Sequence, residues 1–387
     1  MVKAIKVMLI PNNVQKTKMF QYAGASRFAY NWALAREIEN YEKGGKFISD
    51  AELRKEFTKL RHSDEYAWLL NISNNVTKQA IKDACTAYKN FFRGLQKFPR
   101  FKSKKRSMPK FYQDNVKIRF SNTHVKFEGF SSSRKANKQK MNWVRLAEHG
   151  RIPTDVKYMN PRISFDGLNW WISVCVEFPD CRETLNDDGV GIDLGIKDLA
   201  VCSDGTKYKN INKSQKVKKL EKQKRRLQRS ISRSYEKNKK GESYCKTNNV
   251  IKKEKLLLKR NHRLTNIRKN YLNQTISEIV NRKPRFICIE DLNVSGMMKN
   301  RHLSKAVQEQ GFFWFRKQLE YKCSDKGIQL IVADRFYPSS KLCSCCGNIK
   351  KDLKLSDRVY RCECGNMIDR DFQASINLKT YGEKFAS

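Results

Sequence analysis

The 387-residue sequence lacks any apolar run close to the roughly 18 residues with which a helix crosses a membrane. Its first residues also lack a signal peptide, in which an uninterrupted apolar stretch precedes a small-residue cleavage site. We therefore expect a soluble, intracellular protein that has no membrane partner.

Acidic residues are scarce relative to basic ones: 39 Asp and Glu stand against 80 Lys and Arg, which makes the formal net charge +41. Such a charge destabilises a compact chain by self-repulsion unless a polyanion neutralises it, and nucleic acid is the commonest polyanion in a cell. The length and the 39% of apolar residues suffice for two or three domains with hydrophobic cores. The charge excludes most metabolic enzymes and indicates a nucleic-acid partner; a ribosome-like or nonspecifically adhesive protein is the alternative.

The first half of the chain is predicted to contain one strand, several helices and then a group of strands. A strand is predicted over 3–10, and helical spacing of apolar residues extends over about 15–95, with breaks at 44–45 and 71–75. Its aromatic residues are either core residues or platforms for base stacking, with the core favoured. The basic segment 97–106 either follows a phosphate backbone or is a solvated linker. Alternating runs between about 116 and 178 predict a small antiparallel β domain, with a barrel as one option, into which the helices are inserted.

The pattern changes at Gly189, where buried-type strands begin to alternate with helices. Strands are predicted over 190–195, 284–292 and 328–332, with a hairpin partner over 198–205 and helices around 308–322 and 372–381. This succession is typical of an α/β domain. Two basic helices are also predicted, over about 214–233 and 250–280. Their charge run is either a solvated face or a nucleic-acid contact, and we favour the contact because such dense cations repel one another without an anion alongside.

Carboxylates stand at the ends of two predicted strands and at the start of the last predicted helix. They are Asp193, Glu290 and either Asp369 or Asp371. One such residue alone is often a turn residue or a helix cap. Carboxylates from adjacent strands and a facing helix can instead converge on one spot, where divalent cations must offset their repulsion. Two Mg²⁺ ions about 4 Å apart would then support phosphodiester hydrolysis, so the pattern predicts a nuclease.

Five cysteines crowd into one short stretch, in two groups that are each followed by glycine and separated by fourteen residues after the first glycine. Two such knuckles supply four thiolates to a structural zinc ion. A closed four-thiolate site leaves no open position, so this zinc is expected to fold a ribbon and not to catalyse. Cys345 is an alternative to either of its neighbours. The preferred ligands are Cys343, Cys346, Cys362 and Cys364.

The chain resembles the transposon-associated TnpB family, compact RNA-guided DNA endonucleases related to the miniature type V CRISPR effectors. The resemblance rests on three ordered segments, GIDLGIKDLAV, ICIEDLNVSGM and SSKLCSCCG…YRCECG…DRDFQASIN. It extends to RFAYNWALA and FPRFKSKK in the first half, and so covers nearly the whole chain.

The resemblance implies an α+β multidomain fold. A β-barrel wedge domain would comprise 1–14 and 97–185, and an inserted helical recognition domain 15–96. A RuvC nuclease domain of the RNase H-like α/β type would comprise 186–340 and 366–387. The zinc ribbon inserted into it, over 341–365, would bind target nucleic acid.

The resemblance also implies the site and its partners. The catalytic, magnesium-binding triad falls on Asp193, Glu290 and Asp371, with Asp371 preferred because it precedes the Asn-Ala-type helix of the family. This chain departs from the family by having Gln373 where Asn is usual, and by its short second cysteine pair. The implied cofactors are Mg²⁺ or Mn²⁺ together with Zn²⁺, and the implied partners are a guide RNA, with one protein chain per RNA, and target double-stranded DNA.

The implied location is the prokaryotic cytoplasm, with nucleoid association when DNA is bound. Two alternatives remain: a miniature type V CRISPR effector with the same chemistry, and a nonenzymatic zinc-ribbon repressor that binds nucleic acid.

Overall fold

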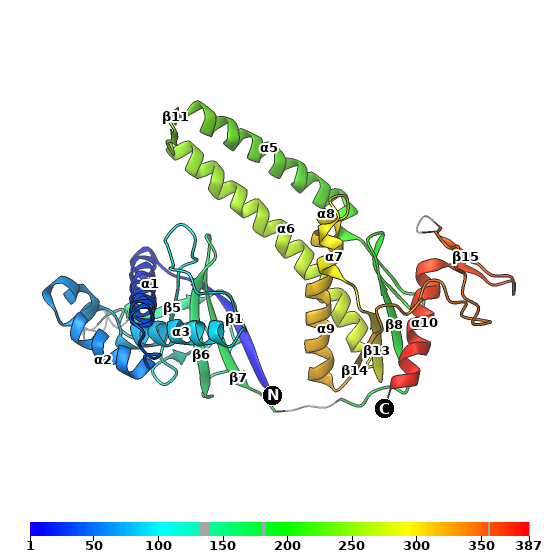
Figure 1. Ribbon diagram of the computed structural model, residues 1–387, viewed down its shortest axis with the longest axis horizontal. Helices are drawn as coiled ribbons and strands as arrows, with labels where there is room; N and C mark the ends of the chain where they lie inside the picture. Colours follow the sequence, from blue (N-terminus) through cyan, green and yellow to red (C-terminus); the bar gives the residue numbers. More distant parts are fainter. Residues whose placement is uncertain (132–139, 180–182, 355–356, 387) are drawn as a thin grey trace. The chain divides into compact units, whose positions relative to one another are not determined.

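The computed structural model describes residues 1–131, 140–179, 183–354 and 357–386. Its contacts divide the chain into two compact units, Met1–Pro179 and Asp180–Ser387 (Figure 1). Within the described residues, no helix combines the length and the apolar character needed to cross a membrane.

Helices follow the first strand of the first unit, as the helical spacing predicts. They are α1 (Asn13–Glu42), α2 (Asp50–Arg61), the 3-10 helix η1 (Asp64–Asn71) and α3 (Asn74–Phe92). The predicted break after α1 is confirmed: Gly44 adopts φ +75°, a backbone conformation that favours glycine. Ser49 then begins α2, because its side chain accepts a hydrogen bond from the backbone N–H of Glu52.

The first unit also contains a seven-stranded sheet with the order β2-β6-β7-β1-β5-β4-β3. β1 pairs antiparallel with β7 and with β5, so the first strand belongs to the same sheet as the strands that follow the helices. No pairing among the described strands joins β2 to β3, and the barrel form stays a prediction. The strands and one further 3-10 helix are β1 (Val2–Ile10), β2 (Lys110–Tyr112), β3 (Arg119–Phe120), β4 (His124–Lys126), η2 (Lys140–Asn142), β5 (Trp143–Leu146), β6 (Tyr158–Phe165) and β7 (Trp170–Glu177).

The second unit is built on a five-stranded mixed sheet with the order β10-β9-β8-β13-β14. β8 and β9 form the predicted antiparallel hairpin, and β13 runs parallel to both β8 and β14. The α/β prediction is therefore confirmed, with one added edge strand, β10. The strands are β8 (Val190–Leu194), β9 (Asp198–Cys202), β10 (Lys207–Lys209), β13 (Phe286–Glu290) and β14 (Gln329–Ala333), with the small pairs β11 (Lys239–Lys240) and β12 (Ser243–Tyr244), and β15 (Val359–Arg361) and β16 (Met367–Asp369).

The helices of this unit include a long pair, α5 and α6, which lie side by side as an extended hairpin (Figure 1). The helix predicted around 308–322 is in fact two helices, because Gly311 adopts φ +71° between α8 and α9. The helices are η3 (Ile211–Lys213), α5 (Gln215–Lys237), α6 (Asn248–Asn281), α7 (Val294–Lys299), α8 (Ser304–Gln310), α9 (Phe312–Lys326) and α10 (Arg370–Phe385).

The two faces of the mixed sheet have different covers. Ile287 and Ile289 of β13 belong to a core that includes Ile276 of α6 and Leu319 of α9. The alternate residues of β13, such as Cys288, pack with Leu378 of α10. Helices α6 and α9 therefore lie on one side of the sheet and α10 on the other (Figure 1).

Candidate active site

Strand alternation places two of the predicted carboxylates on the face of the sheet that α10 covers. In β8, Ile192 points into the core on the opposite face, so Asp193 points toward α10. In β13, Ile289 does the same, and Glu290 therefore follows it onto the α10 face. Ile289 of β13 pairs with Ile192 of the adjacent parallel strand β8. Each carboxylate is the residue that follows this pair in its own strand. The two acidic side chains consequently face the same spot.

Helix α10 approaches this face closely because Gly191 has no side chain. A Cβ at Gly191 would lie 2.0 Å from the backbone oxygen of Ser375, a distance that no side chain tolerates. Asp371 stands in the first turn of α10, one turn before this contact. The close packing of helix on strand therefore brings the third carboxylate to the other two.

The structure separates the roles of the two aspartates that begin α10. Asp369 is the N-cap: its carboxylate accepts hydrogen bonds of 3.1 Å from the backbone N–H groups of Asp371 and Phe372. Burial favours a higher pKa for Asp369, but the Phe372 N–H and the charge of Lys207 outweigh it and lower the pKa. Asp369 is thus occupied as a cap, and of the two aspartates Asp371 has the larger effect on the pKa of Asp193, although the charge of Asp369 also raises it.

The carboxylates perturb one another, which shows that they form one electrostatic unit. Burial raises the pKa of Asp193 well above its ordinary value, and the negative charges of Glu290 and Asp371 raise it further. Burial also raises the pKa of Glu290, against the lowering effect of the hydrogen bond that Ser339 Oγ donates to it. Grouped, partly buried carboxylates of this kind are costly without a cation.

A cavity of about 550 Å³ opens beside Glu290. Basic and aromatic side chains line it, among them Arg335, Phe336 and Lys341. Phe336 is 87% exposed, an unusual state for a phenylalanine. Of the three carboxylates only Glu290 lines this cavity, and Asp291 and Asp334 line it as well.

The four cysteines assigned from the sequence lie together as one cluster. Among the described residues, they are the one group of at least three potential metal ligands whose ligand atoms all lie within 4.8 Å of one another; the three carboxylates are less tightly grouped. The Sγ atoms of Cys343 and Cys364 are 3.7 Å apart, close to the edge of about 3.8 Å that Zn–S bonds of about 2.3 Å give a tetrahedron. The group also includes Cys346 and Cys362, whereas Cys345 is exposed and lies outside it.

The backbone around the thiols forms the two expected knuckles. Gly347 and Gly365 adopt φ +74° and +87°, and each donates its N–H to the carbonyl of the cysteine that opens its knuckle. Burial favours a higher pKa for Cys343, but the backbone N–H groups of Cys346 and Cys345 and the side chain of Asn366 lower it to about 6. This arrangement stabilises a thiolate, which is the form that binds zinc.

The thiol cluster is joined to the helix of Asp371 through Gln373, whose side chain is fully buried. Gln373 Nε2 donates to the carbonyl of Leu342 at 2.6 Å, and its Oε1 accepts from Ser344 Oγ at 2.9 Å. The same Oε1 accepts from Asn366 Nδ2 at 3.3 Å. Both knuckles are therefore hydrogen-bonded to one side chain that lies two residues after Asp371.

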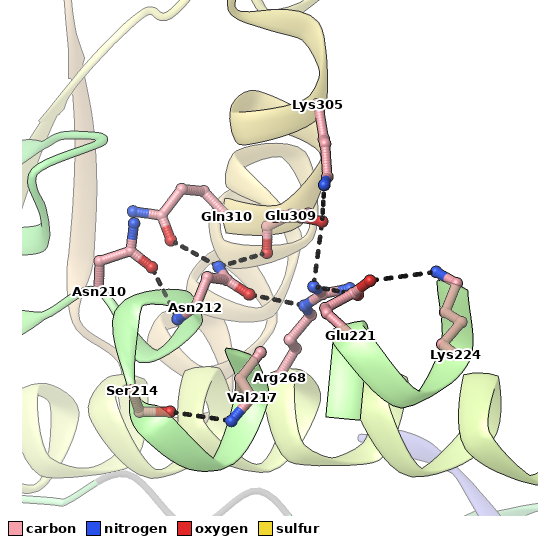
Figure 2. Close-up of polar contacts among 10 residues, drawn as sticks. All are labelled: Asn210, Asn212, Ser214, Val217, Glu221, Lys224, Arg268, Lys305, Glu309 and Gln310. Atoms are coloured by element: carbon pink, nitrogen blue, oxygen red, sulfur yellow. Dashed lines mark hydrogen bonds and ion pairs between the residues drawn. The ribbon is translucent and has the colours of Figure 1, made fainter. Parts of the chain in front are cut away.

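A second polar network lies where the α5–α6 hairpin meets the rest of the unit (Figure 2). Arg268 of α6 bonds Glu221 of α5 at 3.1 Å and Glu309 of α8 at 3.3 Å, and its Nε donates to Asn212 Oδ1 at 2.7 Å. These side chains are mostly shielded from water, with 19% of Arg268 exposed. One guanidinium thus ties together three elements that are distant in sequence.

This network continues to the backbone that follows Asp193. Asn212 Nδ2 donates to the side chain of Gln310 (Figure 2). Gln310 Nε2 in turn donates to the carbonyl of Gly195 at 2.8 Å. Asn210 donates to the carbonyl of Ile196, also at 2.8 Å. The turn after β8 is consequently held in place by residues at the base of the hairpin.

The hairpin itself presents the dense positive charge seen in the sequence. Val217 and Leu220 are buried against Leu264 of α6, while Leu227 is only half-buried. Most cations of α5 point to solvent: Lys216, Lys218, Lys219, Lys222, Arg225, Arg226, Arg229 and Arg233 are exposed. An exposed stripe of this kind matches a phosphate backbone.

Several residues of the site escape sequence reasoning. Ser339, which bonds Glu290, and Gln310, which bonds Gly195, carry no motif of their own, because each meets its partner only through the fold. Gln373 differs, since it breaks the family pattern of the last helix and so marks itself in the sequence.

Three family models match the chain. They are described as "Helix-turn-helix domain" (residues 1–46), "Probable transposase" (173–301) and "Cas12f1-like, TNB domain" (312–378). The last of these spans the thiol cluster and the start of α10. The first covers β1 and α1, so in this chain that stretch folds as a strand and one long helix.

The fold is shared with solved structures of low sequence identity. The complex "Cryo-EM structure of the Cas12f1-sgRNA-target DNA complex" matches with a TM-score of 0.61 over 98% of each chain, at 11% identity. "Structure of the mini-RNA-guided endonuclease CRISPR-Cas_phi3" matches with a TM-score of 0.53, over 98% of this chain and 92% of that one, at 10% identity. Both likenesses concern the fold alone.

Curated relatives match across nearly the whole sequence. The chain is 31% identical to "Putative RNA-guided DNA endonuclease InsQ" of Escherichia coli (strain K12), over 93% of this chain and 87% of the relative. A Streptomyces pristinaespiralis protein, whose name also describes an RNA-guided DNA endonuclease, is 29% identical over 98% of this chain and 89% of its own. The chain therefore belongs to the TnpB family, of which these RNA-guided DNA endonucleases are members.

Proposed function

We propose that this protein binds a guide RNA and hydrolyses target DNA at the carboxylates Asp193, Glu290 and Asp371. The observation that carries the proposal is their convergence: two adjacent parallel strands and a closely packed helix place the three acids on one face, where their charges raise the pKa of Asp193. The curated relatives are named for the same activity.

The donor set suits Mg²⁺ or Mn²⁺, which prefer carboxylate oxygens. Bound metal would supply Lewis acidity for activating water and for stabilising the leaving oxygen. Ser339 holds Glu290 by its hydrogen bond, and the Asp369 cap fixes the turn that presents Asp371.

The thiol cluster suits zinc, with Cys343, Cys346, Cys362 and Cys364 as ligands. Four thiolates close the coordination sphere, so the ion would fold the ribbon over 341–365 and take no part in hydrolysis. Through its hydrogen bonds to both knuckles, Gln373 would hold the folded ribbon against α10, the helix that contains Asp371.

In the proposed reaction, the guide RNA and the protein have different roles in recognising the target. Base pairing with the RNA selects the sequence, and the protein binds the shape and backbone of the heteroduplex through positive charge. We assign the RuvC-like nuclease to 186–340 with 366–387, the wedge domain to 1–14 with 97–185, and helical recognition to 15–96. The exposed cations of α5 would lie along a phosphate backbone.

The test is RNA-directed binding and cleavage with Asp193→Ala, using protein expressed with its native flanking DNA so that the guide RNA co-purifies. We expect the variant to bind matched DNA as the original chain does and to lose Mg²⁺-dependent cutting, by at least about a hundredfold. Asp188→Ala is the matched control. Asp188 lies just before β8, the strand of Asp193, and forms an ion pair with Lys379 at the surface.

Each outcome is decisive. Cutting by Asp193→Ala at the original rate would remove the site assignment. Binding of matched DNA by the original chain without any cutting would favour a repressor, and an RNA with repeat-derived ends would favour a CRISPR effector. Random cellular RNA, or none, would remove the guided function.

A further inference from the structure

The first unit contains a groove of about 840 Å³ between α1 and η1. Its volume lies within the range of sites that hold small organic ligands. One face of α1 forms one wall, with Lys18, Phe28 and Trp32, and η1 forms the other, with Tyr66 and Trp68. The nuclease site described above lies in the second unit and has no part in this groove.

Aromatic rings give the groove a rigid floor. The rings of Phe28 and Tyr66 stack with centroids 5.5 Å apart and planes at 29°. Phe28 also meets Trp68 edge to face, with centroids 5.7 Å apart. Trp68 nevertheless remains 46% exposed, so much of its ring is open to solvent although its position is fixed. An indole that served only core packing would be buried. The half-exposed ring of Trp68 instead offers a face on which a base can stack.

The rim of the groove is cationic and rich in amides. Lys18 and Arg27 line it together with Gln21 and Asn71, and no carboxylate is among the lining residues. In the described part of the chain, neither Lys18 nor Arg27 forms an ion pair. Both cations therefore remain available to an anion.

We propose that this groove holds unpaired nucleotides of a single-stranded nucleic acid segment, with a base stacked on Trp68 and its phosphates beside Lys18 and Arg27. The inference rests on the proposed function in so far as the protein binds nucleic acid. A nucleobase combines a flat apolar face, a polar edge and a neighbouring phosphate, and the groove offers a partner to each. Bases inside a duplex are stacked on both faces, whereas an unpaired base has a free face for Trp68, and we therefore assign a single-stranded occupant.

The test measures the affinity of the full protein for a short single-stranded DNA and for the same strand with abasic sites. Base–aromatic stacking predicts that Trp68→Ala weakens binding of the intact strand by roughly 5- to 100-fold and leaves binding of the abasic strand unchanged. Trp68→Phe, which keeps a ring, restores most of the affinity. Leu70→Ala is the control, because Leu70 belongs to the same short helix, is 48% exposed and lies outside the groove.

A filling variant gives a second and independent test. Nothing lies within 4 Å of a Cβ built on Gly24, which lines the groove, so Gly24→Met can begin a side chain there and occupy part of the groove. We expect it to weaken binding of the intact strand while Trp68 stays in place.

Equal loss on intact and abasic strands, or no loss with either variant, would overturn the inference. Binding of a peptide in the groove in competition with the oligonucleotide would overturn it as well. If the protein cuts guided DNA but Trp68→Ala leaves its affinity for the intact strand unchanged, this inference alone is wrong. If the protein binds no nucleic acid at all, the proposed function is wrong.

Discussion

Replacement of Gln373 by methionine should uncouple the thiolate ribbon from the nuclease centre. Methionine has nearly the shape of glutamine, so it fills the buried site without a large cavity, but it cannot bond the knuckles. Gln373→Met therefore removes the bonds to Leu342, Ser344 and Asn366 while Asp371 and the thiols remain.

The size of the effect follows from these bonds. Three hydrogen bonds at about 1 kcal/mol each suggest a loss of about 3 kcal/mol. The loss is reduced because the Leu342 carbonyl keeps a bond of 2.7 Å from Asn377 Nδ2, and because Ser344 and Asn366 are half-exposed and can bond water. A cost of about 2 kcal/mol remains, which weakens ribbon docking roughly 30-fold.

Hydrogen exchange and cleavage report this change separately. We expect amide exchange in 342–366 and in the first turn of α10 to accelerate by up to about 30-fold, with zinc content unchanged. Cleavage should fall by up to a similar factor, while binding of the guide RNA stays within about twofold of the original, because Gln373 is fully buried and the exposed cations of α5 are unchanged.

The matched control is Ser375→Ala. Ser375 is as buried as Gln373 and lies on the same helix, but its Oγ donates at 2.7 Å only to the carbonyl of Phe372 within that helix. We expect it to cleave and exchange as the original chain does. Unchanged or slower amide exchange, or undiminished cleavage, in Gln373→Met would refute the coupling. Equal effects of Gln373→Met and Ser375→Ala would refute it as well.

Three further predictions concern metal, pH and the hairpin. Cys343→Ser should lose most of the zinc measured by elemental analysis, whereas Cys345→Ser should retain it because this thiol lies outside the cluster; the reverse result would contradict the ligand assignment. Burial, with the charge of a neighbouring lysine, lowers the pKa of Lys102 to about 7, so the unfolded chain binds the proton more tightly and stability rises with pH between about 7 and 10.5. Lys102→Met should therefore raise the melting temperature by a few degrees at pH 7, with a gain that shrinks toward pH 10.5; a gain independent of pH would argue against this explanation. Arg268→Met should lower the free energy of unfolding by about 2 kcal/mol in urea titrations, since two partly exposed carboxylates lose the guanidinium and keep only one longer lysine contact each; an unchanged midpoint would show that the network contributes nothing.

Local patterns in the sequence determined the elements and their chemistry. The apolar runs of β8 and β13 already indicated buried strands, and the spacing of thiols and glycines indicated two knuckles, because such signals arise within a few residues. Gly311 was missed as a helix break, since one glycine inside a helical pattern is often tolerated.

The tertiary structure alone shows how the candidate residues lie relative to one another. Asp369 is held as the N-cap of α10, and the close contact of α10 with Gly191 brings Asp371 near Asp193. Cys345 is excluded from the cluster by the turn of its knuckle. These outcomes depend on contacts between residues far apart in the chain, where backbone approach and desolvation set the energies, and no local pattern encodes them.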